Sequence, residues 1–316
     1  MRVAVLKGGR SLERQVSLRS GARVEDALHG LGHDVAPIDV GSDLVDRLYE
    51  VDAAVAFVAL HGRGGEDGTV QELLELVGIP YTASGPSACI RCMDKVVAKH
   101  ALRDAGLPTP DFYAFSQTAF EELGAAKALP AIEERLDFPI VVKPAGQGSA
   151  LGIKFARTAA DVPGAIVAAF SYDTKVVLER YVAGRDLAVS VLDGPAGPEA
   201  LPVVEAIPQE EDFYDFEARY EIGRTLFTCP ADIGAEATAR AQDLALAVYG
   251  VLGCAGFARI DLMLDDATGA LSVLEANAIP GLTDTSLLPL AAEAAGISFD
   301  ALIARILELA IARAAV

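Results

Sequence analysis

Four short aliphatic runs, separated by helical or glycine-rich segments, occupy the first 90 residues of the chain. The runs RVAVLK, HDVAPIDV, AAVAFVAL and IPYTAS have the length and composition of buried strands. After the first run, Val24, Ala27, Leu28 and Leu31 recur at the spacing of one helix face. This alternation predicts an α/β fold that begins with a parallel, doubly wound sheet, in which the fully apolar third run is the central strand.

Two glycine-rich loops, after residues 6 and 60, would lie at the carboxyl ends of these strands. Ligands bind at that edge in doubly wound sheets. The second loop, HGRGGEDG, precedes TVQELLELVG, which is typical of a helix closed by Gly78. We therefore expect residues 1–93 to form a substrate-binding domain.

The remainder of the 316-residue chain is long enough for two further domains, expected over residues 94–181 and 182–316. Helices are predicted over 93–105, over 238–254 and at the C-terminus. Strands are predicted on both sides of the glycine loop in FPIVVKPAGQGSALGIKFA, and two more in KVVLERYVAGRDLAVSVLDG. The segment IPQEEDFYDFEARYEIG has no clean period and is predicted to be a long functional loop.

Composition disfavours several classes of function. The net charge of −19, from 26 basic and 45 acidic side chains, opposes binding to nucleic acid or to an anionic membrane surface. No apolar run approaches the roughly 18 residues of a membrane span, and the first run is too short for a signal peptide. Cys89 and Cys92 have CxxC spacing without a second pair, so reduced thiols are preferred to a zinc site. A cytoplasmic location is expected.

The segment RIDLMLDDATGALSVLEANAIPG, residues 259–281, predicts a hairpin that carries oxygen ligands. Side chains alternate along a strand, so Glu275 and Asn277 share a face, and Asp261 joins them if it pairs across the turn. Converging carboxylates repel unless a cation lies between them. Oxygen-only ligands favour Mg²⁺, which commonly borrows phosphate oxygens, so a nucleotide is expected nearby. A sheet whose carboxylates point to water is the open alternative.

A second segment, KPAGQGSALG, would supply the phosphate contacts. Lys143 ends a strand, and Gly146, Gly148 and Gly152 can expose backbone N–H groups to phosphate oxygens. The spacing matches neither a P-loop nor a dinucleotide-binding loop and indicates a flap between antiparallel strands. Lys95 in MDK would add a second cation, although either lysine could be a solvated surface charge.

Seven segments occur in the order of one known family. They are GGRSLERQVSLRSG, ALHGRGGEDGTVQELLELVGIPYTASG, MDK, VVKPAGQGSALGI, FYDFEARY, RIDLML and LEANAIPGLTDTSLLPLAAEAAGISF. Between about residues 3 and 312 the chain resembles the D-alanine–D-alanine ligases of the ATP-grasp superfamily. The resemblance implies an N-terminal doubly wound sheet followed by two α+β domains that clasp ATP. It also implies ATP-dependent joining of two D-alanines through an acyl phosphate, for peptidoglycan precursors, by a homodimer.

The resemblance further implies which residues bind ATP and metal. The nucleotide contacts would be Lys95, Lys143, Ser149, Glu179, Arg180, Val182, Asp186 and Arg219. Asp261, Glu275 and Asn277 would bind two Mg²⁺ ions, with Mn²⁺ as a substitute.

Substrate contacts follow from the same resemblance. Glu13 would pair with the ammonium of the first D-alanine and His61 would lie near its carboxylate, while Ser286 and Leu287 would bind the second D-alanine. Arg259 and the N–H of Gly281 would stabilise the tetrahedral oxyanion. Tyr220 would close the loop onto Ser149. Each has a simpler alternative: Glu13 could favour a helix dipole, Ser286 could be only a helix cap, and Tyr220 could be packed on its loop.

Three short segments depart from the pattern of the family. Ala150 replaces a serine, Asp186 a glutamate, and Ala278 with Ile279 stands beside Asn277. These changes leave open a related ligase with a different second amino acid or hydroxy acid. A nucleotide-binding protein without catalysis is a further alternative. The tyrosine of FYDFEARY favours D-alanine as the second substrate, because relatives that use D-lactate or D-serine usually lack it.

Overall fold

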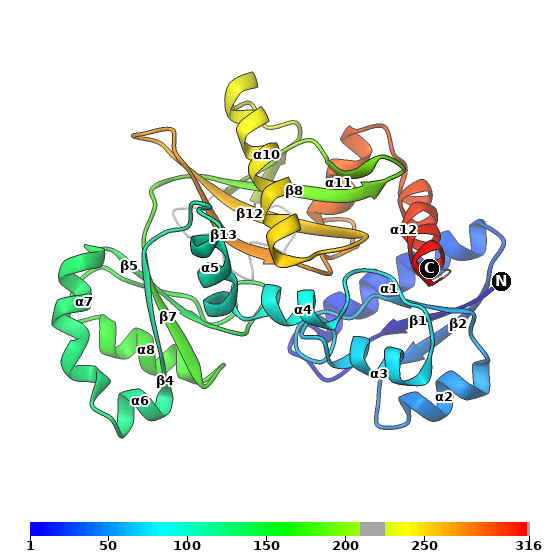
Figure 1. The fold of residues 1–316 in the computed structure, drawn as a ribbon, viewed down its shortest axis with the longest axis horizontal. Coiled ribbons are helices and arrows are strands. Elements are labelled where there is room, and N and C mark those ends of the chain that lie inside the picture. Colours follow the sequence, from blue (N-terminus) through cyan, green and yellow to red (C-terminus); the bar gives the residue numbers. More distant parts are fainter. Residues whose placement is uncertain (209–224, 315–316) are drawn as a thin grey trace.

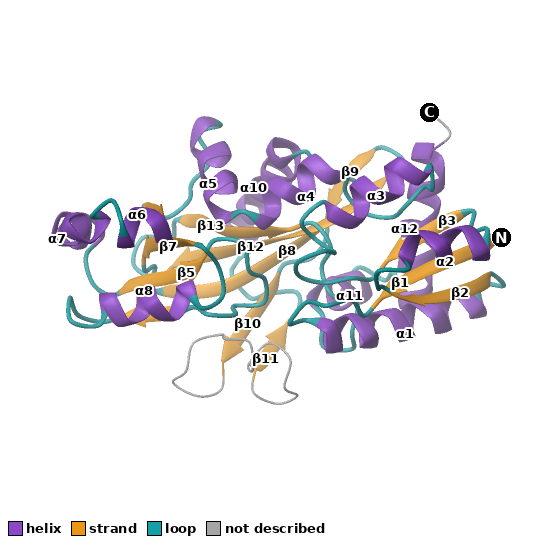
Figure 2. Ribbon diagram, turned by 90° about the horizontal axis from the view of Figure 1, so that it is seen from below, coloured by secondary structure: helices purple, strands orange, loops and turns teal. Residues whose placement is uncertain are grey.

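The strands form three sheets, which follow one another along the chain. In space, the third sheet lies between the first and the second (Figures 1 and 2). The structure is a computed structural model that describes residues 1–208 and 225–314. Among the helices of these residues, none is both long and apolar enough to cross a lipid bilayer.

The first sheet is parallel, as predicted, but its strand order differs from the prediction. β1 (Arg2–Lys7) lies between β2 (Asp34–Asp39) and β3 (Val55–Val58), so the fully apolar third run is not central. Residues of both faces of β3 are fully buried, and this burial explains its composition. The predicted fourth strand is reduced to one bridge between Ala56 and Tyr81, because the hydroxyl of Thr82 takes the next N–H, that of Val58, at 2.9 Å.

Helices α1 (Arg14–Gly30), α2 (Leu44–Val51) and α3 (Thr69–Val77) belong to this first sheet. The predicted closure of α3 by Gly78 is confirmed, with φ +73° at that residue. Helix α4 (Pro86–Met93) follows and was not predicted. The helix expected to begin at Met93 is α5 (Lys95–Asp104), since Asp94 accepts the N–H groups of Val96 and Val97 and starts a new helix.

The second sheet is antiparallel, with the order β4 (Phe112–Ser116), β7 (Lys175–Arg180), β5 (Ile140–Pro144) and β6 (Lys154–Ala156). Helices α6 (Gln117–Glu121), α7 (Leu129–Leu136) and α8 (Val162–Phe170) and the 3₁₀ helix η1 (Ala125–Ala128) accompany it (Figure 1). β5 and β6 pair as predicted, with the glycine loop between them.

The third sheet has six strands and carries the predicted hairpin. Its path is β11 (Thr225–Thr228), β10 (Val204–Pro208), β8 (Gly184–Gly194), β12 (Phe257–Asp265) and β13 (Leu271–Asn277), and β9 (Gly197–Ala200) pairs with β8. The remaining helices are α10 (Ala235–Leu252), α11 (Leu287–Ala294) and α12 (Phe299–Ala314).

Buried side chains connect the first and third sheets into one hydrophobic core, whereas the second sheet has a core of its own. Helix α12 contributes Leu302, Ile303 and Ile306 to the shared core and contacts α1 and β3. Helix α5, which belongs to the predicted domain 94–181, contacts α10 and β13 of the predicted domain 182–316. The boundaries at 93/94 and 181/182 therefore stay a prediction.

Candidate active site

The hairpin β12–β13 places the three predicted metal ligands on one face of the third sheet. Asp261 lies opposite Glu275, and Arg259 lies opposite Asn277. Because residues two apart on a strand share a face, all four side chains project to the same side. The predicted convergence of Asp261, Glu275 and Asn277 is therefore confirmed as geometry.

The acidic side chains of this face are balanced by cations of the protein itself. Arg259 donates to both oxygens of Asp261, at 2.6 and 2.9 Å, and Lys95 Nζ lies 3.1 Å from Glu275 Oε2. Arg259 and Lys95 therefore supply countercharge to these carboxylates within the protein, and the divalent ion at this face stays a prediction. Two carboxylates and an amide on one face are still a donor set that suits a hard divalent cation.

The glycine loop between β5 and β6 is fixed to two other parts of the site. Lys95 Nζ donates to the carbonyl of Gln147 at 2.7 Å, and the hydroxyl of Ser149 donates to Glu13 at the start of α1. A Cβ at Gly148 would lie 2.7 Å from Glu13 Oε1, so a larger residue there would displace the carboxylate of Glu13. Ser149 and Ala150 both have positive φ, at +53° and +58°.

Lys143 takes part in a buried ionic cluster centred on Glu179. Lys143 Nζ is 2.6 Å from one oxygen of Glu179, and Lys99 Nζ is 2.5 Å from the other. Thr109 accepts a further hydrogen bond from Lys99 at 2.6 Å. Burial alone would raise the pKa of Glu179, but the two ammonium groups outweigh it and hold the pKa below its ordinary value.

Replacing Glu179 with glutamine should destabilise the protein by about 3–5 kcal/mol, because two buried ammonium groups would lose their counter-charge. Lys99→Met should cost less, since Glu179 keeps Lys143. Unfolding midpoints in denaturant, without nucleotide, would compare the variants. A lowered pKa stabilises the fold above the ordinary glutamate range, and this contribution is lost as pH falls through the lowered value. The unfolding midpoints of the Glu179 variant and the wild type should therefore converge in acid. Equal midpoints at pH 7 would contradict the role of Glu179 as the counter-charge of the two lysines.

The other predicted nucleotide residues differ in their positions and orientations. Arg180 donates to the carbonyl of Arg135 at 2.9 Å, on the opposite face of β7 from Glu179, so its side chain points away from the cluster. Val182 follows β7, and Asp186 is half-buried on β8 opposite Met263. Arg219 and Tyr220 lie outside the described residues.

The predicted contacts to the first substrate are buried at the carboxyl edge of the first sheet. Glu13 precedes α1 and is 4% exposed, and His61 follows β3 and is 3% exposed. Both ring nitrogens of His61 have protein partners: Nε2 lies 2.9 Å from Ser20 Oγ, and Nδ1 lies 3.5 Å from Glu66 Oε1.

The predicted contacts to the second substrate lie at the start of α11. The helix begins at Leu287 with Ser286 at the N-cap position, as expected, but the hydroxyl makes no capping bond. Instead, Ser286 Oγ accepts the N–H of Thr283 at 2.9 Å. A Cβ at Gly281 would lie 2.7 Å from Ser286 Oγ, so the loop packs too closely for a larger residue.

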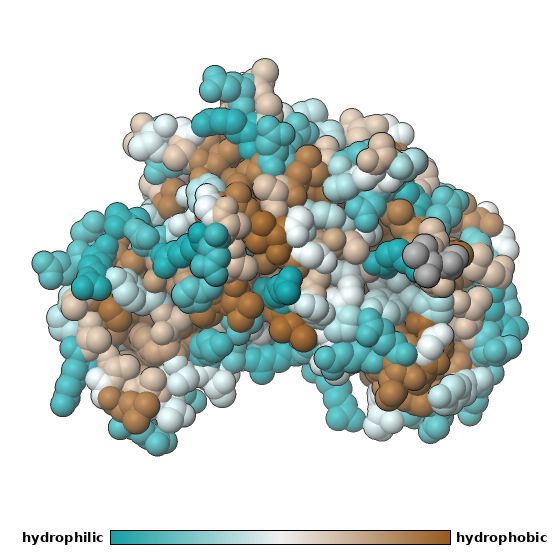
Figure 3. All heavy atoms as spheres, in the orientation of Figure 1, coloured by the Kyte–Doolittle hydropathy of each residue, from teal (hydrophilic) through white to brown (hydrophobic). Residues whose placement is uncertain are grey.

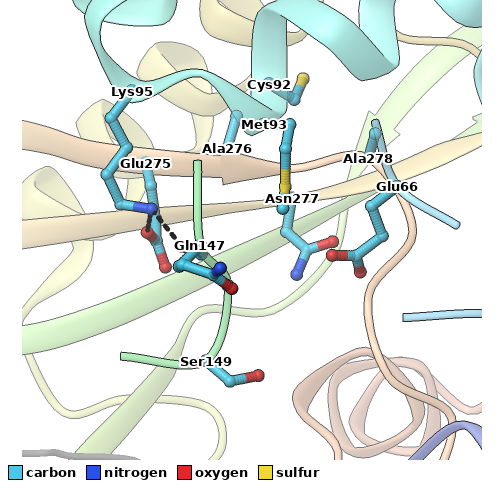
Figure 4. Close-up of a pocket in the computed structure, with 11 residues that line it drawn as sticks. Glu66, Cys92, Met93, Lys95, Gln147, Ser149, Glu275, Ala276, Asn277 and Ala278 are labelled. Atoms are coloured by element: carbon cyan, nitrogen blue, oxygen red, sulfur yellow. Dashed lines mark hydrogen bonds and ion pairs between the residues drawn. The ribbon is translucent and has the colours of Figure 1, made fainter. Parts of the chain in front are cut away.

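One small cavity lies between the glycine loop, the end of β13, the start of α5 and the loop that carries Glu66 (Figure 4). Lys95 lies between Glu275 and Gln147, and Asn277 and Glu66 point into the same space from the opposite side (Figure 4). The sequence reasoning missed Lys99, Glu66 and Ser20. Lys99 could have been found, because it follows Lys95 by four residues and shares its helix face.

Comparisons with known proteins give a consistent result. A family model described as D-ala D-ala ligase C-terminus matches residues 101–308, and one described as D-ala D-ala ligase N-terminus matches residues 41–84. The chain is 44% identical over 306 residues to a D-alanine–D-alanine ligase of Syntrophotalea carbinolica, covering 97% of this chain and 95% of the relative. It is 42% identical over 318 residues to one of Synechococcus sp., covering 100% and 95%.

Solved structures agree with the sequence comparisons. A crystal structure of D-alanine–D-alanine ligase from Bacillus anthracis superposes with a TM-score of 0.86 at 34% identity, covering 100% of this chain and 99% of that one. The same enzyme complexed with ATP gives a TM-score of 0.82 at 33% identity, covering 100% and 98%. By sequence and by fold, the chain belongs to the D-alanine–D-alanine ligase family.

Proposed function

We propose that the chain joins two D-alanines to D-alanyl-D-alanine at the expense of ATP, through an acyl phosphate, for peptidoglycan precursors. The observation that carries the proposal is the single cavity lined by Lys95, Ser149, Glu275 and Asn277, which combines cationic, hydroxyl and oxygen-ligand groups. The full-length relatives named as D-alanine–D-alanine ligases support the substrate, and the ATP complex of the Bacillus anthracis enzyme supports the nucleotide.

In the first step, the carboxylate of one D-alanine attacks the γ-phosphate of ATP, which gives an acyl phosphate and ADP. Lys95, Lys143 and the N–H groups of the glycine loop place positive charge around the transferred phosphoryl group. Glu13 pairs with the ammonium of this D-alanine. Glu179, Arg180, Val182 and Asp186 hold the adenosine, with Arg219 as a further contact. Asp261, Glu275 and Asn277 would hold two Mg²⁺ ions, or Mn²⁺, which supply charge neutralisation at the phosphates.

In the second step, the amine of the other D-alanine attacks the acyl carbon, and phosphate leaves. Arg259 and the N–H of Gly281 stabilise the oxyanion of the tetrahedral intermediate. The free N–H groups at the start of α11, with Ser286 and Leu287, bind the carboxylate of the second substrate. Tyr220, which lies outside the described residues, is assigned by the resemblance to exclude water from the acyl phosphate.

Product identification by mass, from D-alanine, ATP and Mg²⁺, tests the proposal. We expect D-alanyl-D-alanine and ADP in equal amounts, and no product from L-alanine. A related ligase with another second substrate would make no dipeptide from D-alanine alone, but would form a product once D-lactate or D-serine is added. ATP binding without ADP formation under all these conditions would identify a protein without catalysis.

We also propose that ATP lies between the second and third sheets, with domains over residues 1–93, 94–181 and 182–316. The residues assigned to the nucleotide support this, since Lys143 and Glu179 belong to the second sheet and Glu275 to the third. The use of ATP and D-alanine supports a cytoplasmic location.

A homodimer through the N-terminal domain completes the proposal. A hydrophobic area lies over α3 (Figure 3), where Leu76 is 82% exposed and borders a groove that also contains Leu73 and Val45. Leu76→Glu should convert a dimer to a monomer in sedimentation experiments, because a charge would be buried at the interface. Leu123→Glu, at a residue 78% exposed beside the second sheet, is the control and should leave the mass unchanged. A dimer that persists in the Leu76 variant would place the interface elsewhere.

A further inference from the structure

Ser20, on α1, connects the first-substrate side of the site to the loop that carries Gly281 and Ser286. The residue is fully buried. Its Oγ lies 2.9 Å from His61 Nε2, and it accepts the N–H of Leu282 at 3.1 Å. The hydroxyl therefore bridges two segments that are more than 200 residues apart in sequence.

The direction of these hydrogen bonds follows from the number of protons available. The N–H of Leu282 can only donate, so Ser20 Oγ accepts it and keeps its own proton for another partner. His61 Nε2 is the other group within reach, and Ser20 donates to it in the tautomer that carries the ring proton on Nδ1. Nδ1 faces Glu66 Oε1 at 3.5 Å. Glu66 is fixed in turn by the N–H of Gly62 at 3.1 Å.

Helix α1 binds both backbone polar groups of Leu282, the N–H through Ser20 and the carbonyl through Arg23. Arg23, one turn after Ser20, donates to the carbonyl of Leu282 at 2.7 Å and pairs with Asp284 at 3.0 Å. Leu282 directly follows Gly281, whose N–H we assign to the oxyanion, and Ser286 lies four residues further. A shift of Leu282 would therefore move the groups that act on the second substrate.

We propose that Ser20 is a positioning residue for the second half of the reaction, acting through a buried chain from Glu66 through His61 and Ser20 to Leu282. Glu66 lines the cavity at one end of this chain (Figure 4), and the oxyanion loop lies at the other end. His61 joins Ser20 to Glu66 within this chain, and its predicted place near the carboxylate of the first substrate stays part of the proposed function. The proposal rests on the proposed function.

Ser17 provides a matched control on the same helix. It is also fully buried, and its hydroxyl also makes two hydrogen bonds, accepting the N–H of Gly8 at 2.8 Å and donating to the carbonyl of Ala59 at 2.7 Å. These partners belong to the first sheet and its loops and do not include the oxyanion loop. Ser17→Ala therefore removes an equivalent pair of buried bonds without releasing Leu282.

The test compares dipeptide formation with ADP formation in purified wild-type protein, Ser20→Ala, Ser17→Ala and Ser20→Thr. For Ser20→Ala we expect dipeptide kcat to fall about tenfold to a hundredfold, the cost of a displacement near 1 Å. The ratio of dipeptide to ADP should fall below one, because water takes the acyl phosphate, and the KM for ATP should stay within about threefold. Ser17→Ala should keep a ratio of one, and Ser20→Thr, which keeps the hydroxyl, should restore most of the dipeptide rate.

Several outcomes would overturn the proposal. A ratio of one in Ser20→Ala, or an equal loss in Ser20→Ala and Ser17→Ala at matched melting midpoints, would show that Ser20 does not position the loop. The same conclusion would follow if Ser20→Thr had the dipeptide-to-ADP ratio of Ser20→Ala together with the melting midpoint of the wild type. Failure of the wild type to make any dipeptide would instead count against the proposed function, and the two failures are thus distinguishable.

Discussion

Glu275→Gln is expected to lower the rate of dipeptide formation on the order of 1,000-fold, because a metal ligand supplies several kcal/mol of transition-state stabilisation. Glutamine keeps the shape of the side chain but loses the charge that faces Lys95 at 3.1 Å. The measurement is steady-state ADP release at increasing Mg²⁺. The Mg²⁺ concentration for half-maximal rate should rise strongly in the variant.

Two comparisons separate the proposed metal role of Glu275 from its pairing with Lys95. Lys95→Met removes the same ion pair by changing the lysine and leaves Glu275 in place. It should raise the KM for ATP without a matching change in the Mg²⁺ requirement. Glu199→Gln is the control, since Glu199 belongs to the same sheet and pairs with Arg305 at 2.9 Å far from the cavity. A Glu275 variant that turns over within threefold of the wild type would remove the metal assignment.

Arg259→Lys is expected to lower kcat by about 100- to 1,000-fold, the usual cost of losing one oxyanion donor. Lysine keeps the positive charge beside Asp261, so the buried carboxylate stays paired, but it cannot form the two-bonded fork seen at 2.6 and 2.9 Å. The KM for ATP should change little, because Arg259 is assigned to the second step.

Arg185→Lys is the matched control for Arg259. Arg185 forms the same fork with Glu205, at 2.6 and 2.5 Å, on the neighbouring strand of the same sheet. Its replacement should reproduce any general effect of losing a fork, but not the loss of kcat. Equal kinetics in the two variants, or a loss confined to the KM for ATP, would contradict the role of Arg259 at the oxyanion.

Local patterns explain what could be predicted from the sequence. Period-two alternation predicted that Asp261, Glu275 and Asn277 share a face, and the glycines at 146–152 predicted the loop between two antiparallel strands. The start of α11 after Ser286 also followed from a local capping pattern. The pairing of Arg259 with Asp261 was equally accessible, since the two lie two residues apart on one strand, and it was overlooked.

The features that were missed depend on contacts between distant segments. The position of β1 at the centre of its sheet is set by pairing, which the apolarity of β3 could not reveal. Lys99 meets Glu179 across 80 residues and Ser20 meets Leu282 across 262. The helix face that Lys99 shares with Lys95 could have marked it as a candidate, but nothing in its own segment marks Ser20. The helix predicted to begin at Met93 begins instead at Lys95, because the side chain of Asp94 caps it.

The packing of α12 against α1 and β3 also governs the order in which the protein can mature during synthesis. The first sheet leaves the ribosome early, yet the side chains that complete its core come from residues 299–314. The core of the N-terminal domain therefore stays incomplete, with one hydrophobic surface uncovered, while some 200 further residues are translated. The second sheet can pack earlier, because the residues of its own core have all been translated once residue 180 has emerged.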